Sequence, residues 1–350
     1  MALNTDYGTP IELTGAAQAA ANAFEASMPL SRWLPYRANP TLTYSFDASG
    51  TTPVDVAQYR AFDVPAPYGS LGERITKQGT LPAISRKLPI GEYTQLQYAG
   101  RLALLGDLEA EYAQRLGLGI AARVELARVQ AIVEGKVTLA ENGVSAVIDY
   151  GRDPALSAAL SGAKLWTAAK AVPVDDVIGW RQIVKEKSKG TLPTTILLSN
   201  AVMNSLMMNE QIITYALGRT DNLPNRVAAG EVEAVLAGYA GLTTVVIADD
   251  AYATYNFGQP VWPDGVVVLL PPAGAVNIDG GGSLGTTDYG VTAEAIQPEY
   301  GIPANEQSGI FAAAFGHSDP EGLDVLASAV ALPLVQRANA TFAATVAAAA

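Results

Sequence analysis

Residues 100–134 read GRLALLGDLEAEYAQRLGLGIAARVELARVQAIVE, and this stretch decides the fold. Apolar side chains recur three or four positions apart, which places them on one helical face and predicts a single long helix. The pairs Glu111 with Arg115 and Glu125 with Arg128 are predicted to support the opposite face. At about 1.5 Å per residue the helix would be a rod about 50 Å long. The apolar positions are Leu105, Leu108, Tyr112, Leu116, Ile120, Val124 and Ala127.

Three glycines interrupt this predicted helix, at Gly106, Gly117 and Gly119. Glycine weakens a helix interior, so these positions would let the rod bend or let a neighbouring segment approach closely. We interpret the stretch as the structural spine of the molecule.

The segment before the helix, Thr41 to Pro89, predicts a long two-stranded excursion. Apolar and polar residues alternate over Thr41–Phe46 as in a half-buried strand, and Gln78–Leu88 is expected to return antiparallel to it. Prolines and glycines between the two strands disfavour a helix. An excursion with no core of its own must bury its apolar side chains elsewhere, and we expect neighbouring copies of the chain to supply the surface.

The excursion is locally basic within an acidic chain. Over residues 60–88 five cations outnumber two acids, whereas the whole chain has a formal net charge of -12. Such a contrast favours docking between subunits, while a solvated loop with chance charges is the alternative. We predict that this loop lies across the long helix of an adjacent copy, with its cations facing Glu109 and Glu111. The cations are Arg60, Arg74, Lys77, Arg86 and Lys87.

Composition narrows the functional classes. The 350 residues include no cysteine and one histidine, His317, which excludes disulfide frameworks and thiolate metal sites and leaves no basis for a multi-histidine centre. Charged residues make up 16% of the chain and hydrophobic residues 49%, so extra apolar area is expected at subunit interfaces. The net negative charge argues against a nucleic-acid reader, because phosphate binding requires clustered Lys and Arg. We expect no cofactor, no metal and no enzymatic role.

The rest of the chain predicts a mixed α and β fold. Residues 14–28 predict a short Ala-rich helix in an N-terminal arm, and 136–150 predict a hairpin with a Glu-Asn-Gly turn. Helical and strand patterns then alternate up to about residue 270, and strand-like runs return at 310–315 and 326–335. No secretory signal and no membrane-spanning run is recognised, which predicts a cytoplasmic protein.

A glycine-rich run at 279–285 matches two catalytic patterns. Gly280, Gly282 and Gly285 fit G-x-G-x-x-G of dinucleotide sites, and Ser283 lies in a G-x-S-x-G match typical of hydrolases. Both patterns require a helix directly afterwards, and residues 286–290 are a poor helix start. We interpret the run as a glycine-rich surface loop, with a Ser283, Asp288, His317 triad as the enzyme alternative.

Another candidate cluster is Asp249 with Asp250, which follow a predicted strand. Paired carboxylates can hold a divalent ion or share a proton. A turn at the end of a strand explains them more simply, so we expect no metal there.

Several landmarks in fixed order carry a family resemblance. Gly135-Lys136-Val137-Thr138, followed by Asp149-Tyr150-Gly151-Arg152, resembles the G-K, strand, D-x-G-R signature of the phage lambda type major capsid protein family, capsid protein E. Further similar landmarks are Trp166, the strand entry Trp262-Pro263-Asp264, and the late strand Ala331-Leu332-Pro333-Leu334.

The resemblance implies an α+β fold, that of tailed-phage major capsid proteins. It implies hexamers and pentamers in an icosahedral shell that encloses double-stranded DNA without reading its sequence. Scaffold, portal and decoration proteins would be partners, with assembly in the host cytoplasm and residence in the virion. The implied divisions are an N-terminal arm at 1–40, an extended loop at 41–92, a spine helix and peripheral-domain hairpin at 93–152, an axial domain at 153–307, and return strands to the peripheral domain at 308–350.

A bacterial nanocompartment shell shares this implied fold and is the second reading of the chain. A serine hydrolase is the third, and it depends on the triad named above. Shell formation by the isolated protein separates the first two readings from the third.

Overall fold

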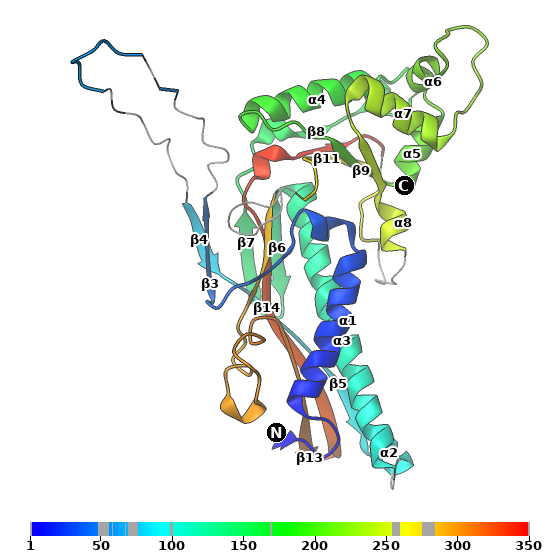
Figure 1. Ribbon diagram of the computed structural model, residues 1–350. Helices are drawn as coiled ribbons and strands as arrows, with labels where there is room; N and C mark the ends of the chain where they lie inside the picture. The colour runs from blue at the N-terminus through cyan, green and yellow to red at the C-terminus, as the bar shows by residue number, and fades with distance from the viewer. Residues whose placement is uncertain are drawn as a thin grey trace.

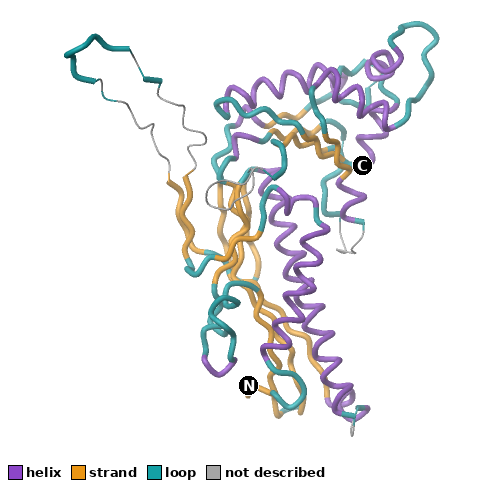
Figure 2. Tube along the Cα trace, in the orientation of Figure 1, coloured by secondary structure: helices purple, strands orange, loops and turns teal. Residues whose placement is uncertain are grey.

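The computed structural model describes residues 2–47, 56–57, 59–66, 68, 76–98, 101–168, 170–253, 260–274 and 284–348. Figure 1 shows an elongated molecule in which two long helices lie beside a sheet, with a second domain at one end and a strand pair projecting from the side. The colouring by secondary structure in Figure 2 separates the helical layer of the long body from its strands. No helix in the described ranges is long and apolar enough to cross a membrane.

The predicted spine helix is confirmed as α3 (Leu102–Glu134), 33 residues long. It ends at Gly135, whose φ of 73° is left-handed and favours glycine over residues with a side chain. The predicted apolar face is buried or half-buried throughout. Glu111 and Arg115 form the predicted exposed ion pair, with atoms 2.6 Å apart.

The second predicted pair on this helix, Glu125 with Arg128, is not on an exposed face. Glu125 and Arg128 are fully buried, because a second helix covers the side of α3 that we had assigned to solvent. That helix is α1 (Pro10–Ser27), which begins with a capping box between Thr9 and Glu12 and stops before Pro29. The predicted Ala-rich helix at 14–28 is confirmed as α1, and it packs along α3 of the same chain.

A six-stranded sheet lies against both helices, with β14 packed on α3 and β13 packed on α1. Its longest strand, β14, pairs antiparallel with β13, β12 and β5. Leu13, Phe24, Leu116, Ile120 and Val325 belong to the core between the helices and this sheet. The strands are β1 (Ala2–Asn4), β2 (Tyr36–Ala38), β5 (Ala83–Gly91), β12 (Gly285–Gly290), β13 (Ile310–Ser318) and β14 (Glu321–Val335).

The second domain is a five-stranded sheet with its own core. Its strand order is β10, β9, β11, β15, β8, and Figure 1 shows α4 and α7 together over this sheet. Trp180 stacks between Trp166 and Phe342, with ring centroids 5.6 and 5.0 Å away, which fixes α4 on the sheet. The strands are β8 (Ser157–Ala159), β9 (Thr195–Leu198), β10 (Thr244–Ile247), β11 (Val266–Leu270) and β15 (Phe342–Thr345). The helices are α4 (Pro173–Lys187), α5 (Asn200–Met207), α6 (Glu210–Leu217), α7 (Ala229–Ala240) and α8 (Ala248–Tyr252).

Two strand pairs and several short helices complete the described chain. The predicted excursion begins as β3 (Thr43–Asp47) paired with β4 (Thr76–Thr80), but most of the predicted return strand at 78–88 belongs instead to β5, which pairs with β14. The predicted hairpin is β6 (Lys136–Glu141) paired with β7 (Val144–Asp149). Helix α2 (Glu92–Gln97) precedes the spine. The short 3-10 turns are η1 (Pro29–Arg32), η2 (Pro154–Leu156), η3 (Gly162–Lys164), η4 (Pro298–Tyr300) and η5 (Ala338–Ala340).

Two of the expected domain boundaries differ from the pairing of the strands. β12 was assigned to the 153–307 domain, but it pairs with β14 in the larger sheet. β15 was assigned to the return strands of 308–350, but it pairs with β11 and β8 in the smaller sheet. Both differences arise because strand partners far apart in sequence leave no local signal.

Candidate assembly surfaces and the motif behind them

The residues of the G-K, strand, D-x-G-R order form one compact joint at the end of α3. Tyr150 N–H donates to the Gly135 carbonyl over 3.1 Å, so the end of the hairpin returns to the last turn of the helix. Asp149 Oδ1 accepts from Gly151 N–H at 2.6 Å, which holds a turn in which Gly151 has a φ of 73°. Lys136 opens β6 opposite Asp149 in the ladder. The motif is therefore a turn that brings Arg152 back to the helix.

Arg152 caps the C-terminus of α3. Its Nη1 donates to the Ile132 carbonyl and its Nη2 to the Val133 carbonyl, both at 2.6 Å. These carbonyls belong to the last helical turn, which lacks intrahelical donors and carries partial negative charge. Burial lowers the pKa of Arg152 to about 10, so the side chain remains charged at neutral pH.

The Trp-Pro-Asp landmark is a second turn, at the entry to β11. Trp262 Nε1 donates to the Val266 carbonyl at 3.1 Å, and Gly265 adopts a φ of 73° between them. Val346 N–H donates to the Gly265 carbonyl at 2.7 Å. Pro263 and Asp264 lie within this turn, where the Pro263 carbonyl accepts from Val266 N–H at 3.3 Å.

The excursion beyond β3 and β4 carries aromatic side chains with no cover. Tyr59, Phe62 and Tyr68 are 95% or more exposed. Arg60 donates to the Val64 carbonyl at 2.6 Å within the same loop. Such exposure of large apolar groups marks an interaction surface.

The base of the excursion is attached to the D-x-G-R turn. Lys77 Nζ donates to the Asp149 carbonyl at 2.6 Å. On the same strand pair Phe46 packs near Tyr150, with ring centroids 6.3 Å apart. The loop therefore projects from a fixed root on the hairpin and spine.

The other residues predicted for the contact between the loop and a neighbouring spine do not share one environment in the structure. Arg86 is exposed on β5, Lys87 lies 3.9 Å from Asp324, and Arg74 lies outside the described residues. Glu111 remains on the surface with Arg115 as its partner. Glu109 is fully buried beneath the segment before α1, so the sequence placed it wrongly on the exposed face of the spine.

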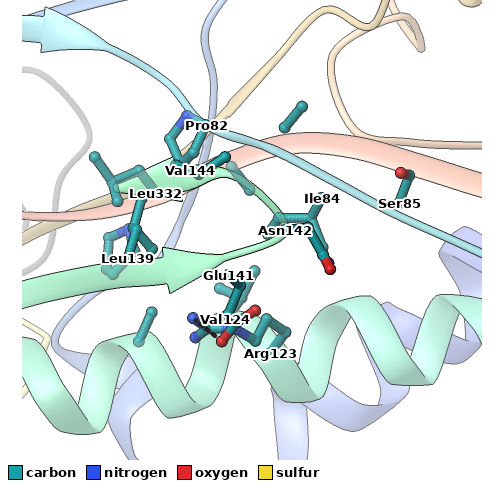
Figure 3. A pocket seen from close by; sticks show the side chains of 14 residues that line it. Pro82, Ile84, Ser85, Arg123, Val124, Leu139, Glu141, Asn142, Val144 and Leu332 are labelled. Carbon is teal, nitrogen blue, oxygen red and sulfur yellow. Dashed lines mark hydrogen bonds and ion pairs between the residues drawn. The ribbon is translucent and has the colours of Figure 1, made fainter. Parts of the chain in front are cut away.

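A groove runs between β5, α3 and the tip of the β6–β7 hairpin. One part of it is a cavity of about 280 Å³, which adjoins a larger cavity of about 680 Å³ along α3. Figure 3 shows Arg123 on the helix and Glu141 at the hairpin tip pointing toward each other, and they pair at 3.1 Å across the groove. Ile84 and Val124 give the groove apolar walls, and Glu141 is an exposed acid at its edge. No local pattern in the sequence indicates this groove, because four segments far apart in the chain line it.

Comparisons with known proteins decide the family. The family model for phage major capsid protein E matches residues 39–346. The chain belongs to this family. It is a phage major capsid protein, and its role is structural. No protein of curated function matches the chain.

Solved structures agree on the fold of this capsid protein. A putative capsid protein of an Escherichia coli prophage superposes with a TM-score of 0.57 at 15% identity, covering 95% of this chain and 99% of that one. A phage-related protein from Bordetella bronchiseptica gives a TM-score of 0.58 at 11% identity, with 95% and 94% covered. The satellite phage P4 procapsid, a structure that includes the size determination protein, gives 0.51 at 8% identity, with 95% and 90% covered. The expected fold of tailed-phage major capsid proteins is confirmed.

The capsid protein does not assemble the alternative catalytic triad. Asp288 lies opposite Leu332 on β14, whereas His317 lies opposite Gly322 on the same strand. At about 3.3 Å per residue these positions are about 30 Å apart, far beyond hydrogen-bond reach. Asp288 is instead buried in a two-point ion pair with Arg37, at 2.6 and 2.8 Å.

The other chemical readings of the sequence also meet structural objections. The glycine run continues as strand β12 rather than a helix, so the dinucleotide pattern lacks the helix N-terminus that it requires. Ser283 lies outside the described residues. Asp249 accepts from Asn200 N–H at 2.6 Å, which ties the first turn of α8 to α5. Within the described ranges no cluster of three or more His, Cys, Asp or Glu side chains could hold a metal.

A buried polar cluster joins the layers of the capsid protein. Arg128 donates to Glu125 at 3.1 Å and to Thr287 of β12 at 2.9 Å, and it lies 3.3 Å from a carboxylate oxygen of Glu25 on α1. Although burial opposes the charge, Glu25 and Glu125 raise the pKa of Arg128 above its ordinary value. The cation therefore holds two helices and the sheet together.

Two tyrosines complete this cluster. Tyr252 of α8 donates to Glu125 at 2.9 Å, and Tyr289 of β12 donates to Glu25 at 2.7 Å. Burial raises the pKa of Glu125, and the charge of Arg128 acts against that shift. Because α8 follows strand β10 of the second domain, the cluster connects both domains to the spine.

Proposed function

We propose that this capsid protein forms hexamers and pentamers of an icosahedral shell that encloses DNA, and that the excursion of each copy docks on the spine of its neighbour. Membership of the capsid protein E family supports the proposal that the protein forms a shell. The family is described as a phage protein, which favours a phage head over a bacterial nanocompartment. Scaffold, portal and decoration proteins would act with the shell, and assembly would occur in the host cytoplasm.

The groove beside α3 is the receiving surface that the geometry favours. Its apolar walls suit the exposed rings of Tyr59 and Phe62, and Glu141 at its rim suits Arg60 of the same loop. Glu141 takes the place of Glu109 as the acid that faces the cations of the loop, because the Glu109 carboxyl is buried within its own subunit. In such an interface the buried aromatic side chains supply most of the affinity, and the charges at the rim set the orientation of the partner.

Electron microscopy of the purified, overexpressed protein tests shell formation. Closed shells or tubes of the wild type are the expected result, and a monodisperse single particle at high concentration would refute it. The enzymatic alternative predicts loss of ester hydrolysis on Ser283→Ala, whereas a structural role predicts no hydrolysis to lose.

The docking contact has its own test. The double variant Tyr59→Ser with Phe62→Ser should keep the circular dichroism spectrum of the wild type, because these side chains touch little of their own subunit, but it should fail to assemble. Tyr93→Ser is the matched control, since Tyr93 is 74% exposed on α2, away from the loop. Normal shells from the double variant would contradict the docking contact without affecting the assignment as a capsid protein.

A further inference from the structure

One carboxyl group in the spine lies in surroundings that do not suit its charge. Glu109 on α3 is 0% exposed, and neither of its oxygens makes a hydrogen bond of normal geometry within the described residues. A buried ionised carboxylate without hydrogen bonds or a cation is strongly disfavoured, so such a group binds a proton or regains contact with water.

The N-terminal segment covers this carboxyl. A Cβ at Gly8 would lie 3.0 Å from Glu109 Oε2, and a Cβ at Gly106 would lie 2.9 Å from the Tyr7 carbonyl oxygen. Only glycine permits so close a crossing of the segment over the helix. Before the crossing, β1 pairs antiparallel with the end of β13, from Ala2 opposite Gly316 to Asn4 opposite Ala314. The segment is therefore held at one end by three ladder residues.

We propose that residues 2–9 form a latch controlled by protonation, which stays closed over α3 while Glu109 carries a proton and opens as that carboxyl ionises. This inference depends on the fold of one chain and not on the proposed docking of the excursion. Opening would release β1 and expose the edge of β13, a surface on which a strand from a neighbouring copy can pair.

Burial and the charge of Asp6 both favour the protonated form of Glu109. Burial raises the pKa of Glu109 to about 7, the Gly8 N–H opposes this shift, and the negative charge of Asp6 adds to it. Glu12 at the start of α1 is held by Thr9, at 2.8 and 3.0 Å. Farther along the sheet, Lys87 and His317 both lie within 4 Å of the Asp324 carboxylate and interact with it. On its own helix Asp107 is exposed, and Glu111 pairs with Arg115.

The sign and size of the effect follow from linkage. In the closed state the carboxyl keeps its proton up to pH about 7, whereas in the open state it ionises near the ordinary value of 4.5. The closed form therefore binds more protons, and its advantage declines as pH rises from 4.5 to 7. The ratio of open to closed segments should increase by up to about 300-fold across that window, the antilogarithm of the difference between the two pKa values.

Hydrogen exchange by mass spectrometry on the full-length protein measures this ratio. Protection factors of the amides in residues 2–9, corrected for intrinsic exchange, should fall by up to about 300-fold between pH 4.5 and pH 8. Amides of α4 serve as the internal reference, because that helix lies in the other domain. Glu109→Gln should keep the segment protected at every pH, since a neutral amide of the same shape does not ionise. Glu111→Gln on the exposed side of the helix should behave like the wild type.

A second variant keeps the test decisive if Glu109→Gln folds poorly. Asp6→Asn removes the like charge, lowers the pKa of the closed carboxyl, and should reduce the total fall in protection. The proposal is overturned if protection of residues 2–9 does not change with pH in the wild type, or if Glu109→Gln or Asp6→Asn shows the full wild-type fall.

Discussion

The glycines of the spine allow one contact to be tested with its own control. Gly117 lies where α1 crosses α3, and a Cβ there would lie 3.0 Å from the Ala17 Cα and still closer to the Ala17 carbonyl oxygen. Gly119 is two residues further along the same helix, and a Cβ there would meet no atom within 4 Å. We therefore compare Gly117→Ala with Gly119→Ala, the same chemical change in the same helix.

The expected magnitudes follow from two opposing effects. Alanine is more favourable than glycine in a helix interior by about 1 kcal/mol, and this gain applies at both positions. At Gly117 the added methyl group meets backbone atoms, which cannot rotate away, so α1 must shift; overpacking of this kind costs about 1–3 kcal/mol. Gly119→Ala should stabilise the protein by about 1 kcal/mol. Gly117→Ala should be less stable than Gly119→Ala by about 1–3 kcal/mol.

Urea unfolding of dispersed subunits, followed by circular dichroism, measures the difference. The midpoints should separate while the slopes stay equal, because the surface exposed on unfolding is the same for both variants. If Gly117→Ala proves as stable as Gly119→Ala, α1 moves away from α3 without cost and the close packing of these helices does not constrain the fold.

Three further changes test the joints of the structure. Arg152→Met removes the charged donors at the end of the spine and should cost about 2–4 kcal/mol of unfolding free energy, measured as above. Arg128→Met leaves Glu125 buried without its cation and should cost about 3–5 kcal/mol, and adding Glu125→Gln should recover part of that loss in a double-mutant cycle. Lys77→Met removes the bond to the Asp149 carbonyl, and faster hydrogen exchange confined to β3 and β4 should follow, with unchanged exchange in α3.

Local patterns predicted the elements of this protein well. The 3.6-residue repeat found α3 because its buried positions are close in sequence, and the Glu-Asn-Gly turn found the hairpin β6–β7 for the same reason. Glu111 and Arg115 were placed correctly on an exposed face. Glu109, Glu125 and Arg128 were not, because helical periodicity shows one apolar stripe and gives no information about a second element that covers the polar side.

The sequence alone determined the mixed fold, the long spine, the projecting excursion and the family, since each depends on residues a few positions apart or on motifs in fixed order. Only the tertiary structure decided that α1 lies along the spine, that Arg128 joins α1, α3 and β12, and that the N-terminal segment buries Glu109. These contacts connect residues more than 90 positions apart. Their energy depends on burial and on charges brought together by folding, which no local pattern in the chain records.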